Sequence, residues 1–64
     1  MEITIFNGRE KAINFLQRWA KTRDSVENVV RMSGGIIVEI EDEEEAQELI
    51  DELDRLGMNY EEEA

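Results

Sequence analysis

Apolar and polar side chains alternate along MEITIF, the first segment of the chain. A period of two is typical of a strand with one buried face, so we expect a strand over residues 1–6. Asn7 follows and can accept a backbone N–H, and Glu10 lies three residues later, as in a capping box. A helix is therefore expected to begin directly after this strand.

The next segment has the period of a helix. At 100° per residue its apolar side chains fall within an arc of about 160°, while basic and amide side chains fill the opposite side. We expect this helix to end near Thr22, and Trp19 to anchor a core between the helix and a sheet. The apolar positions are Ala12, Ile13, Phe15, Leu16, Trp19 and Ala20.

The stretch VENVVRMSGGIIVEIE, residues 26–41, has two interpretations. One is a helix through Met32, which would contain three β-branched valines of modest helix propensity. The other is a pair of strands around the SGG triplet, with glycines where a hairpin needs positive φ, and we favour this hairpin. Val26 and Asn28 fit the register of the first strand less well, which indicates a bulge or loop there.

A second helix is expected after this hairpin. Asp42 is placed to cap it, Glu45 stands at its third position, and three glutamates in its first turn suit the positive end of the helix dipole. Gly57 stands where a left-handed C-cap is expected, and residues 58–64 are expected to close the chain as a short strand whose glutamates guard its edge. The apolar stripe of the helix consists of Ala46, Leu49, Ile50, Leu53 and Leu56.

The predicted order is therefore strand, helix, strand, strand, helix, strand. Two right-handed βαβ crossovers then give a four-stranded antiparallel sheet, in the order 4-1-3-2, with both helices on one face. This α+β arrangement is the ferredoxin-like βαββαβ two-layer sandwich. Because 64 residues suffice for one core only, residues 1–64 are expected to form a single domain.

The second half of the chain resembles the heavy-metal-associated (HMA) domain family. The resemblance lies in SVENVV and in GGIIVEIEDEEEAQELIDELDRLGMNYE, where a Val-x-x-Val entry precedes a hairpin, an acidic Leu-rich helix, Leu-Gly and a short strand. It implies a ferredoxin-like module of a family that carries copper or related ions on a Cys-x-x-Cys loop after the first strand. Here that loop reads FNGREKA, without cysteine, so no metal ligand is carried over and metal transport is not expected.

The same loop is similar to that of acylphosphatases, which are also ferredoxin-like and hold phosphate with an Arg-bearing loop at the start of the first helix. Asn7, Gly8 and Arg9 carry this resemblance. It implies a weak anion site formed by backbone N–H groups and a guanidinium. The chain is shorter than those enzymes and lacks their longer glycine-rich loop, so catalysis is the least favoured interpretation.

The chain contains no Cys, no His and no Pro. No thiol can act as a nucleophile or soft metal ligand, and the usual acid–base side chain at neutral pH is missing. Together with clean amphipathic patterns and helix caps, this composition favours a non-catalytic, cofactor-free domain, and de novo design is one origin that fits it. Without cysteine, a signal peptide or an apolar run that could span a bilayer, we expect a cytoplasmic protein.

The net charge of −10 is concentrated in the second part of the chain. Residues 1–38 are net +2, whereas residues 39–64 are net −12. This charge repels nucleic-acid phosphates and anionic lipids, so neither is expected as a partner. We expect part of the acidity to be balanced across the pair of helices by Lys11, Arg18 and Lys21.

One face of the predicted sheet is not covered by helices. On the first strand of the hairpin, we expect Val29 and Arg31 on this face and Val30 pointing inward. Phe6, Val29 and Ile37 then form a small exposed apolar spot, a candidate interaction face for another protein or for a second copy in a homodimer. A single aromatic among acids is a poor surface for stacking bases, so RNA is not expected there.

Two functions agree with these patterns. The first is a structural scaffold or a protein-interaction module. The alternative is an acidic inhibitor that mimics nucleic acid and binds a basic protein through residues 39–54 and 61–63. This alternative requires the carboxylates to lie along one face.

Overall fold

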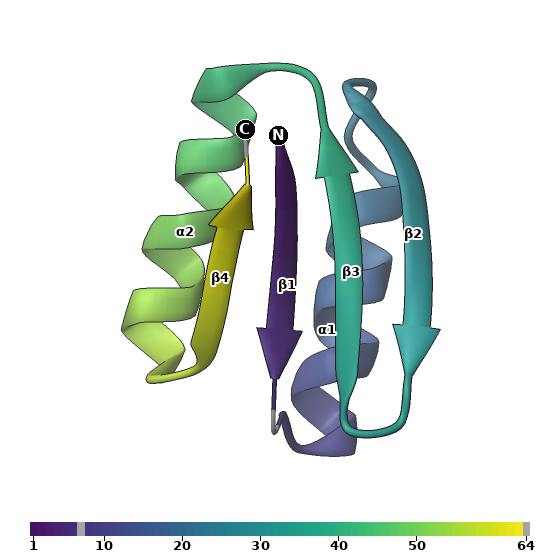
Figure 1. The fold of residues 1–64 in the computed structure, drawn as a ribbon, viewed down its shortest axis with the longest axis vertical. Coiled ribbons are helices and arrows are strands. Elements are labelled where there is room, and N and C mark those ends of the chain that lie inside the picture. Colours follow the sequence, from purple (N-terminus) through teal and green to yellow (C-terminus); the bar gives the residue numbers. More distant parts are fainter. Residues whose placement is uncertain (7, 64) are drawn as a thin grey trace.

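A computed structural model of the chain describes residues 1–6 and 8–63. Within these residues the helices and strands follow in the order that the hydrophobic pattern predicts (Figure 1). The elements are β1 (Glu2–Phe6), α1 (Glu10–Lys21), β2 (Val26–Met32), β3 (Gly35–Ile40), α2 (Glu43–Leu56) and β4 (Asn59–Glu63).

The four strands form one antiparallel sheet in the order β2-β3-β1-β4, which confirms the predicted 4-1-3-2 order. β1 and β3 are central, and β2 and β4 form the two edges (Figure 1). α1 and α2 cover the same face of the sheet, so the chain has the predicted ferredoxin-like two-layer arrangement. No helix within the described residues is long and apolar enough to cross a membrane.

A single hydrophobic core lies between the sheet and the helices. β1 and β3 supply it with alternate side chains, and no polar or charged residue is buried in the part of the chain that the structure describes. Trp19 packs against the core as predicted, whereas Phe15, at the margin of the apolar arc, is 41 % exposed. The buried residues are Ile3, Ile5, Ile13, Leu16, Ala20, Ile36, Val38, Ile40, Ala46, Leu49, Ile50 and Leu53.

Glycines allow the hairpin between β2 and β3. Gly34 has a φ of 73°, in the left-handed region that the SGG triplet predicts, and Gly57 ends α2 in the same region with a φ of 69°. Gly35 has a different role, because a Cβ there would lie 2.4 Å from the backbone oxygen of Ile5. Its missing side chain therefore permits the close pairing of β1 and β3.

β2 contains the predicted bulge near its start. Val26 pairs with Ile40, whereas Asn28 pairs with Glu39, so Glu27 is an extra residue with no partner on β3. Because successive side chains of a strand point to opposite faces, one extra residue reverses the face of every residue after it.

The prediction that Val29 lies on the open face is wrong for this reason. Val29 pairs with the buried Val38 and packs against the core. Val30 instead pairs with Ile37 on the open face and is 45 % exposed. The pattern suggested an irregularity in β2 but not the reversal, because Val29 and Val30 are both apolar and either could have been the inward residue.

The two helices begin differently. Asp42 Oδ1 accepts a hydrogen bond from the backbone N–H of Glu44 at 2.9 Å, which confirms the predicted cap of α2. For α1 the predicted cap is wrong: its N-cap residue is Arg9, whose side chain makes no capping hydrogen bond. Glu10 is thus the first helical residue rather than the third, and Asn7 lies outside the described residues.

The two edges of the sheet differ in charge. β4 carries Glu61, Glu62 and Glu63, all exposed, which opposes the addition of a further strand to this edge. The charged residues of β2 are Glu27, at the bulge, and Arg31. The β2 edge is therefore irregular near its start and carries little charge over the rest of its length.

Substitution of Leu16 tests the position of the core. Leu16→Ala is expected to lower the free energy of unfolding by about 2–5 kcal/mol, because it leaves a cavity where a fully buried side chain packs. Lys11→Ala, at an exposed position of α1, is the control and should change it by less than about 0.5 kcal/mol. Chemical denaturation followed by circular dichroism measures both, and equal effects would contradict this placement of α1.

The two hairpin glycines should differ in their tolerance of a side chain. Gly34→Ala is expected to cost about 1–2 kcal/mol, the penalty of a left-handed backbone with open space around it. Gly35→Ala should cost more, because the backbone of β1 must move away. The same denaturation measurement compares them, and a larger cost at Gly34 would argue against the β1–β3 register.

Candidate functional site

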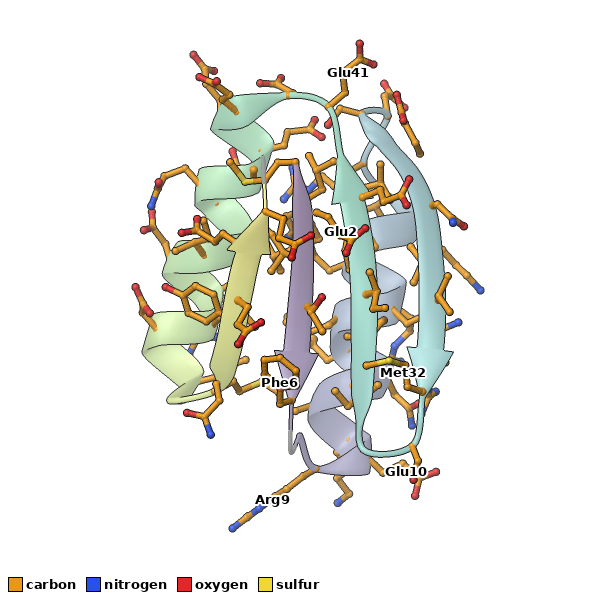
Figure 2. All side chains as sticks on the ribbon, in the orientation of Figure 1. Glu2, Phe6, Arg9, Glu10, Met32 and Glu41 are labelled. Atoms are coloured by element: carbon orange, nitrogen blue, oxygen red, sulfur yellow. The ribbon has the colours of Figure 1, made fainter. Side chains whose placement is uncertain are left out.

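The candidate site is the open face of the sheet, the side that α1 and α2 leave uncovered, which faces the viewer in Figure 2. Val30, Ile37 and Thr4 lie side by side across β2, β3 and β1. Met32 lies over Gly35, where a Cβ would come within 3.3 Å of its methyl group, and it is 39 % exposed. We call the residues Phe6, Val30, Met32 and Ile37 the apolar strip.

A row of acidic residues crosses the same face beside the apolar strip. Glu39 pairs with Glu2, and Glu2 pairs with Glu63, so carboxylates occupy neighbouring positions on β3, β1 and β4. Neighbouring strands are about 4.8 Å apart, and like charges directly opposite one another destabilise a sheet. We call Glu2, Glu39 and Glu63 the carboxylate row.

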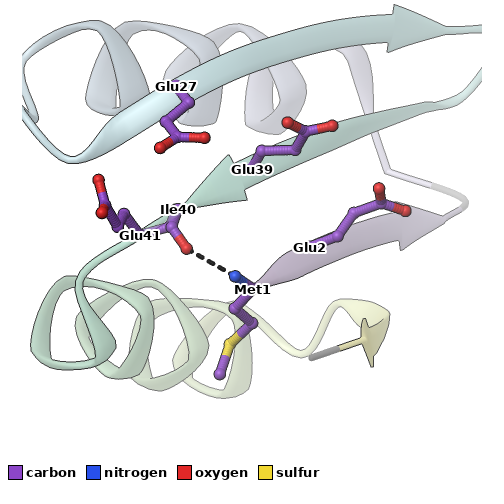
Figure 3. A pocket seen from close by; sticks show the side chains of 6 residues that line it. All are labelled: Met1, Glu2, Glu27, Glu39, Ile40 and Glu41. Carbon is purple, nitrogen blue, oxygen red and sulfur yellow. Dashed lines mark hydrogen bonds between the residues drawn. The ribbon is translucent and has the colours of Figure 1, made fainter.

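The acidic region continues into a hollow beyond the row, with a volume of about 280 Å³ (Figure 3). Glu27 and Glu41 join Glu2 and Glu39 around it, and the amino group of Met1 donates a hydrogen bond to a backbone carbonyl at 2.8 Å. Among residues 1–6 and 8–63, no group of three or more Asp, Glu, His or Cys is arranged to hold a metal ion. Four carboxylates and one amino group thus line the hollow, which is net negative beside the open face.

The structure places two of the three predicted apolar site residues on the open face. Phe6 and Ile37 lie there as expected, and Val30 and Met32 join them in place of Val29. The extra residue predicted in β2 could have identified Val30 and Met32, because a bulge turns every later side chain of the strand to the other face.

Arg31 does not lie on the open face as expected. It pairs with the buried Ile36, and its Nη1 donates hydrogen bonds to Asn14 Oδ1 at 2.7 Å and Gln17 Oε1 at 3.2 Å. The bulge that moves Val29 also moves this guanidinium to the helix side. The open face thereby has no basic side chain from β2.

The predicted anion site at Asn7, Gly8 and Arg9 has little geometric support. Asn7 lies outside the described residues, and the backbone N–H of Gly8 donates to the carbonyl of Gly34 at 3.0 Å, so it is not free to bind an anion. The side chain of Arg9 points away from the domain (Figure 2).

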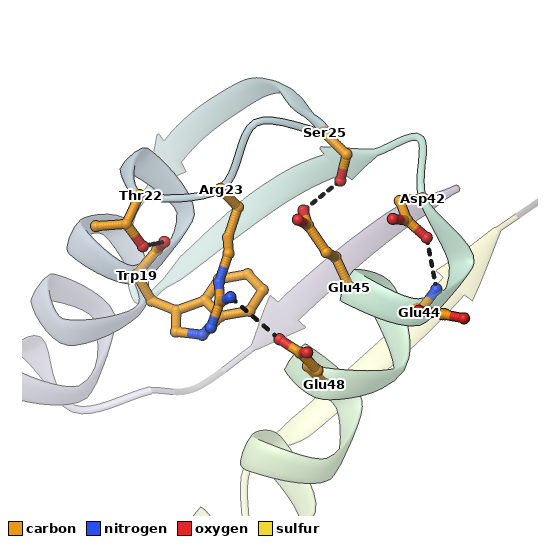
Figure 4. Close-up of polar contacts among 8 residues, drawn as sticks. All are labelled: Trp19, Thr22, Arg23, Ser25, Asp42, Glu44, Glu45 and Glu48. Carbon is orange, nitrogen blue, oxygen red and sulfur yellow. Dashed lines mark hydrogen bonds and ion pairs between the residues drawn. The ribbon is translucent and has the colours of Figure 1, made fainter.

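One cation outside α1 connects the two helical segments. Arg23, in the turn after α1, forms an ion pair with Glu48 of α2 at 3.3 Å, and its guanidinium lies 4.7 Å from the centre of the Trp19 ring (Figure 4). Ser25 also donates a hydrogen bond to Glu45 of α2. We expected the three basic residues of α1 to balance the charge of α2. Among the described residues, the ion pair to α2 from outside that helix comes instead from Arg23.

Three side chains near the outer end of α2 have shifted pKa values. A hydrogen bond from Arg55 lowers the pKa of Glu52, and the same contact raises the pKa of Arg55. The hydroxyl of Tyr60 donates to Asp54 Oδ1 at 3.0 Å, and this hydrogen bond, followed by burial and nearby carboxylates, raises the pKa of Tyr60. All of these shifts arise in contacts that join α2 to itself or to β4, away from the open face.

The acidic side chains do not share one face. Glu2, Glu39 and Glu63 lie on the open face, whereas Glu44 and Glu48 belong to α2, which covers the opposite face. A nucleic-acid mimic through residues 39–54 requires a single charged face, and the geometry gives that alternative no support.

Comparisons with known proteins return no relative of this chain. No protein-family model matches it, and the searches of curated proteins and of solved structures found no match. The candidate site therefore rests on its own geometry.

The carboxylate row generates a prediction about stability. Glu39→Gln is expected to raise the free energy of unfolding by about 0.5 kcal/mol, because it removes a repulsion from the row, and the gain should shrink in high salt. Glu43→Gln removes the same charge from the first turn of α2, where the dipole favours it, so it should be neutral or destabilising. Urea denaturation at about 20 mM and about 500 mM salt measures both; a gain for Glu43→Gln alone would contradict the prediction.

Tyr60 generates a prediction about alkaline pH. Because folding raises the pKa of Tyr60, its stabilising contribution is complete below about pH 10, the pKa in an unfolded chain, and is lost as pH rises through the folded value. The stability difference between the parent and Tyr60→Phe should therefore fall above about pH 10. Denaturation at several pH values between about 8 and 11 tests this, and a constant difference would mean that Tyr60 titrates alike in both states.

Proposed function

We propose that this domain is a non-catalytic, cofactor-free protein-interaction module that binds a partner through the open face of its sheet. The apolar strip carries the proposal: Val30 is 45 % exposed, Met32 is 39 % exposed, and Phe6 and Ile37 are only partly buried on the same face. Single exposed apolar residues are common on any surface, whereas a cluster often marks an interface.

The groups with shifted pKa values make contacts within α2 and between α2 and β4. A general acid or a nucleophile needs a neighbour that shifts its pKa within a site where substrate can bind. Here Glu52, Arg55 and Tyr60 have shifted pKa values, and each makes a contact that stabilises α2 or the β4 edge. None of them faces the apolar strip.

The resemblance to heavy-metal-associated domains is not extended to ion transport. The loop between β1 and α1 contains no cysteine, and the chain has no histidine that could replace it. A shared strand–helix rhythm supports a similar fold, and fold alone does not determine function.

Selection from a random peptide library displayed on phage, against the immobilised full chain, tests the proposal. Peptides that bind the parent should bind the double variant Val30→Ser, Ile37→Ser at least about tenfold more weakly, a loss of about 1.4 kcal/mol. The matched control is Phe15→Ser, which removes a side chain of similar exposure from α1 and should leave binding unchanged.

The proposal fails if the selected peptides bind the parent and the double variant equally. It also fails if their binding depends on Phe15, since that would place the interaction on the helix layer. Circular dichroism of each variant confirms that it is folded before binding is compared.

A further inference from the structure

We propose that the partner is a cationic amphipathic helix, which places apolar side chains on the apolar strip and Lys or Arg side chains on the carboxylate row. This inference rests on the proposed function and specifies the partner of that same face. β1 and β3 already have neighbours on both sides, so no strand can be added at the centre of the sheet. An occupant must therefore contact side chains, which a helix presents along one face.

The spacing of the two features suits a helix. Along β3, Ile37 of the apolar strip and Glu39 of the carboxylate row are two residues apart on one face, or about 7 Å. A helix advances about 6 Å over four residues. An apolar residue at position i and a basic residue at position i+4 can therefore contact Ile37 and Glu39 at the same time. The same offset separates Thr4 from Glu2 on β1.

Charge complementarity indicates that the partner carries basic side chains opposite the carboxylate row. The ion pairs among the described residues use Glu48 and Glu52, both on α2, so the carboxylate row has no basic partner within that part of the chain. Glu27, Glu41 and the hollow extend the negative region in the same direction. Lys or Arg side chains of a partner at this position would reduce the repulsion between the carboxylates of the row. They would also favour the orientation of the partner in which its basic side chains lie over the row.

A second copy of this chain fits the face poorly. Each copy carries a net charge of −10. Two open faces brought together would place each carboxylate row over either the other row or the apolar strip. Both arrangements remove carboxylates from water without a cation, which is strongly unfavourable.

The test uses a synthetic Leu/Lys amphipathic peptide of about 18 residues, whose helix of about 27 Å matches the 26 Å long axis of the domain. It is titrated into the ¹⁵N-labelled full chain, and amide shifts locate the contact. Two control peptides are needed: one with Gln in place of Lys, and one with the same Leu and Lys content but no amphipathic face. The expected result is shifts at Thr4, Val30 and Ile37, with binding at least about tenfold tighter than for either control.

Matched variants separate the contribution of the row from general attraction to an acidic protein. The double variant Glu2→Gln, Glu39→Gln should weaken binding about tenfold. The double variant Glu43→Gln, Glu44→Gln removes the same charge from α2 and should change binding less than about twofold. Raising the salt from about 50 to about 500 mM should weaken binding to the parent.

The outcomes distinguish this inference from the proposed function. If the Gln peptide binds the open face as tightly as the Lys peptide, the cationic partner is wrong and the interaction module stands. If binding is unchanged in Val30→Ser, Ile37→Ser, or if the shifts lie on α2, both proposals fail. The cationic helix is also wrong if the Leu/Lys peptide does not bind, or if the two charge variants weaken its binding equally. It is wrong as well if light scattering shows that the parent is a dimer and that the double variant Val30→Ser, Ile37→Ser is a monomer.

Discussion

The burial of one side of a four-stranded sheet beneath two helices is the interaction on which the rest of the structure depends. Both helices lie on one side of the sheet, so within the described residues the other side is open. Because side chains alternate along a strand, the residues that fill the core also determine which neighbours face outward. Ile3 and Ile5 in the core thus place Thr4 and Phe6 on the surface. The alternation of side chains along the strands therefore determines both the core and the candidate site.

The sequence predicts the elements well where a single period runs without interruption. α2 has a clean apolar stripe, an acidic cap at Asp42 and a glycine at its end, and each appears where local chemistry requires it. Phe6 and Ile37 were also placed on the correct face, because they lie on central strands whose alternation is regular. Local pattern and tertiary packing agree in these segments, so either one gives the same answer.

Prediction from the sequence failed where a local signal had more than one geometric meaning. An extra residue in β2 reverses the face of Val29, and valine residues on both faces gave no contrast to reveal it. Asn7 and Glu10 have the spacing of a cap, but α1 begins at Glu10. The carboxylate row depends on two registers, Glu2 with Glu39 and Glu2 with Glu63, and alternation within one strand does not specify how it pairs with its neighbour. Arg23 reaches Glu48 from a turn, where no helical pattern applies.

The unequal edges of the sheet have a consequence for the size of any assembly built by edge pairing. A fibril requires every copy to extend its sheet at both ends, and here the β4 end is opposed by Glu61, Glu62 and Glu63. A pair that joined β2 to β2 would have β4 at both of its outer edges, so it could not grow further in the same way. Edge pairing that avoided β4 would therefore be limited to a closed, two-fold pair.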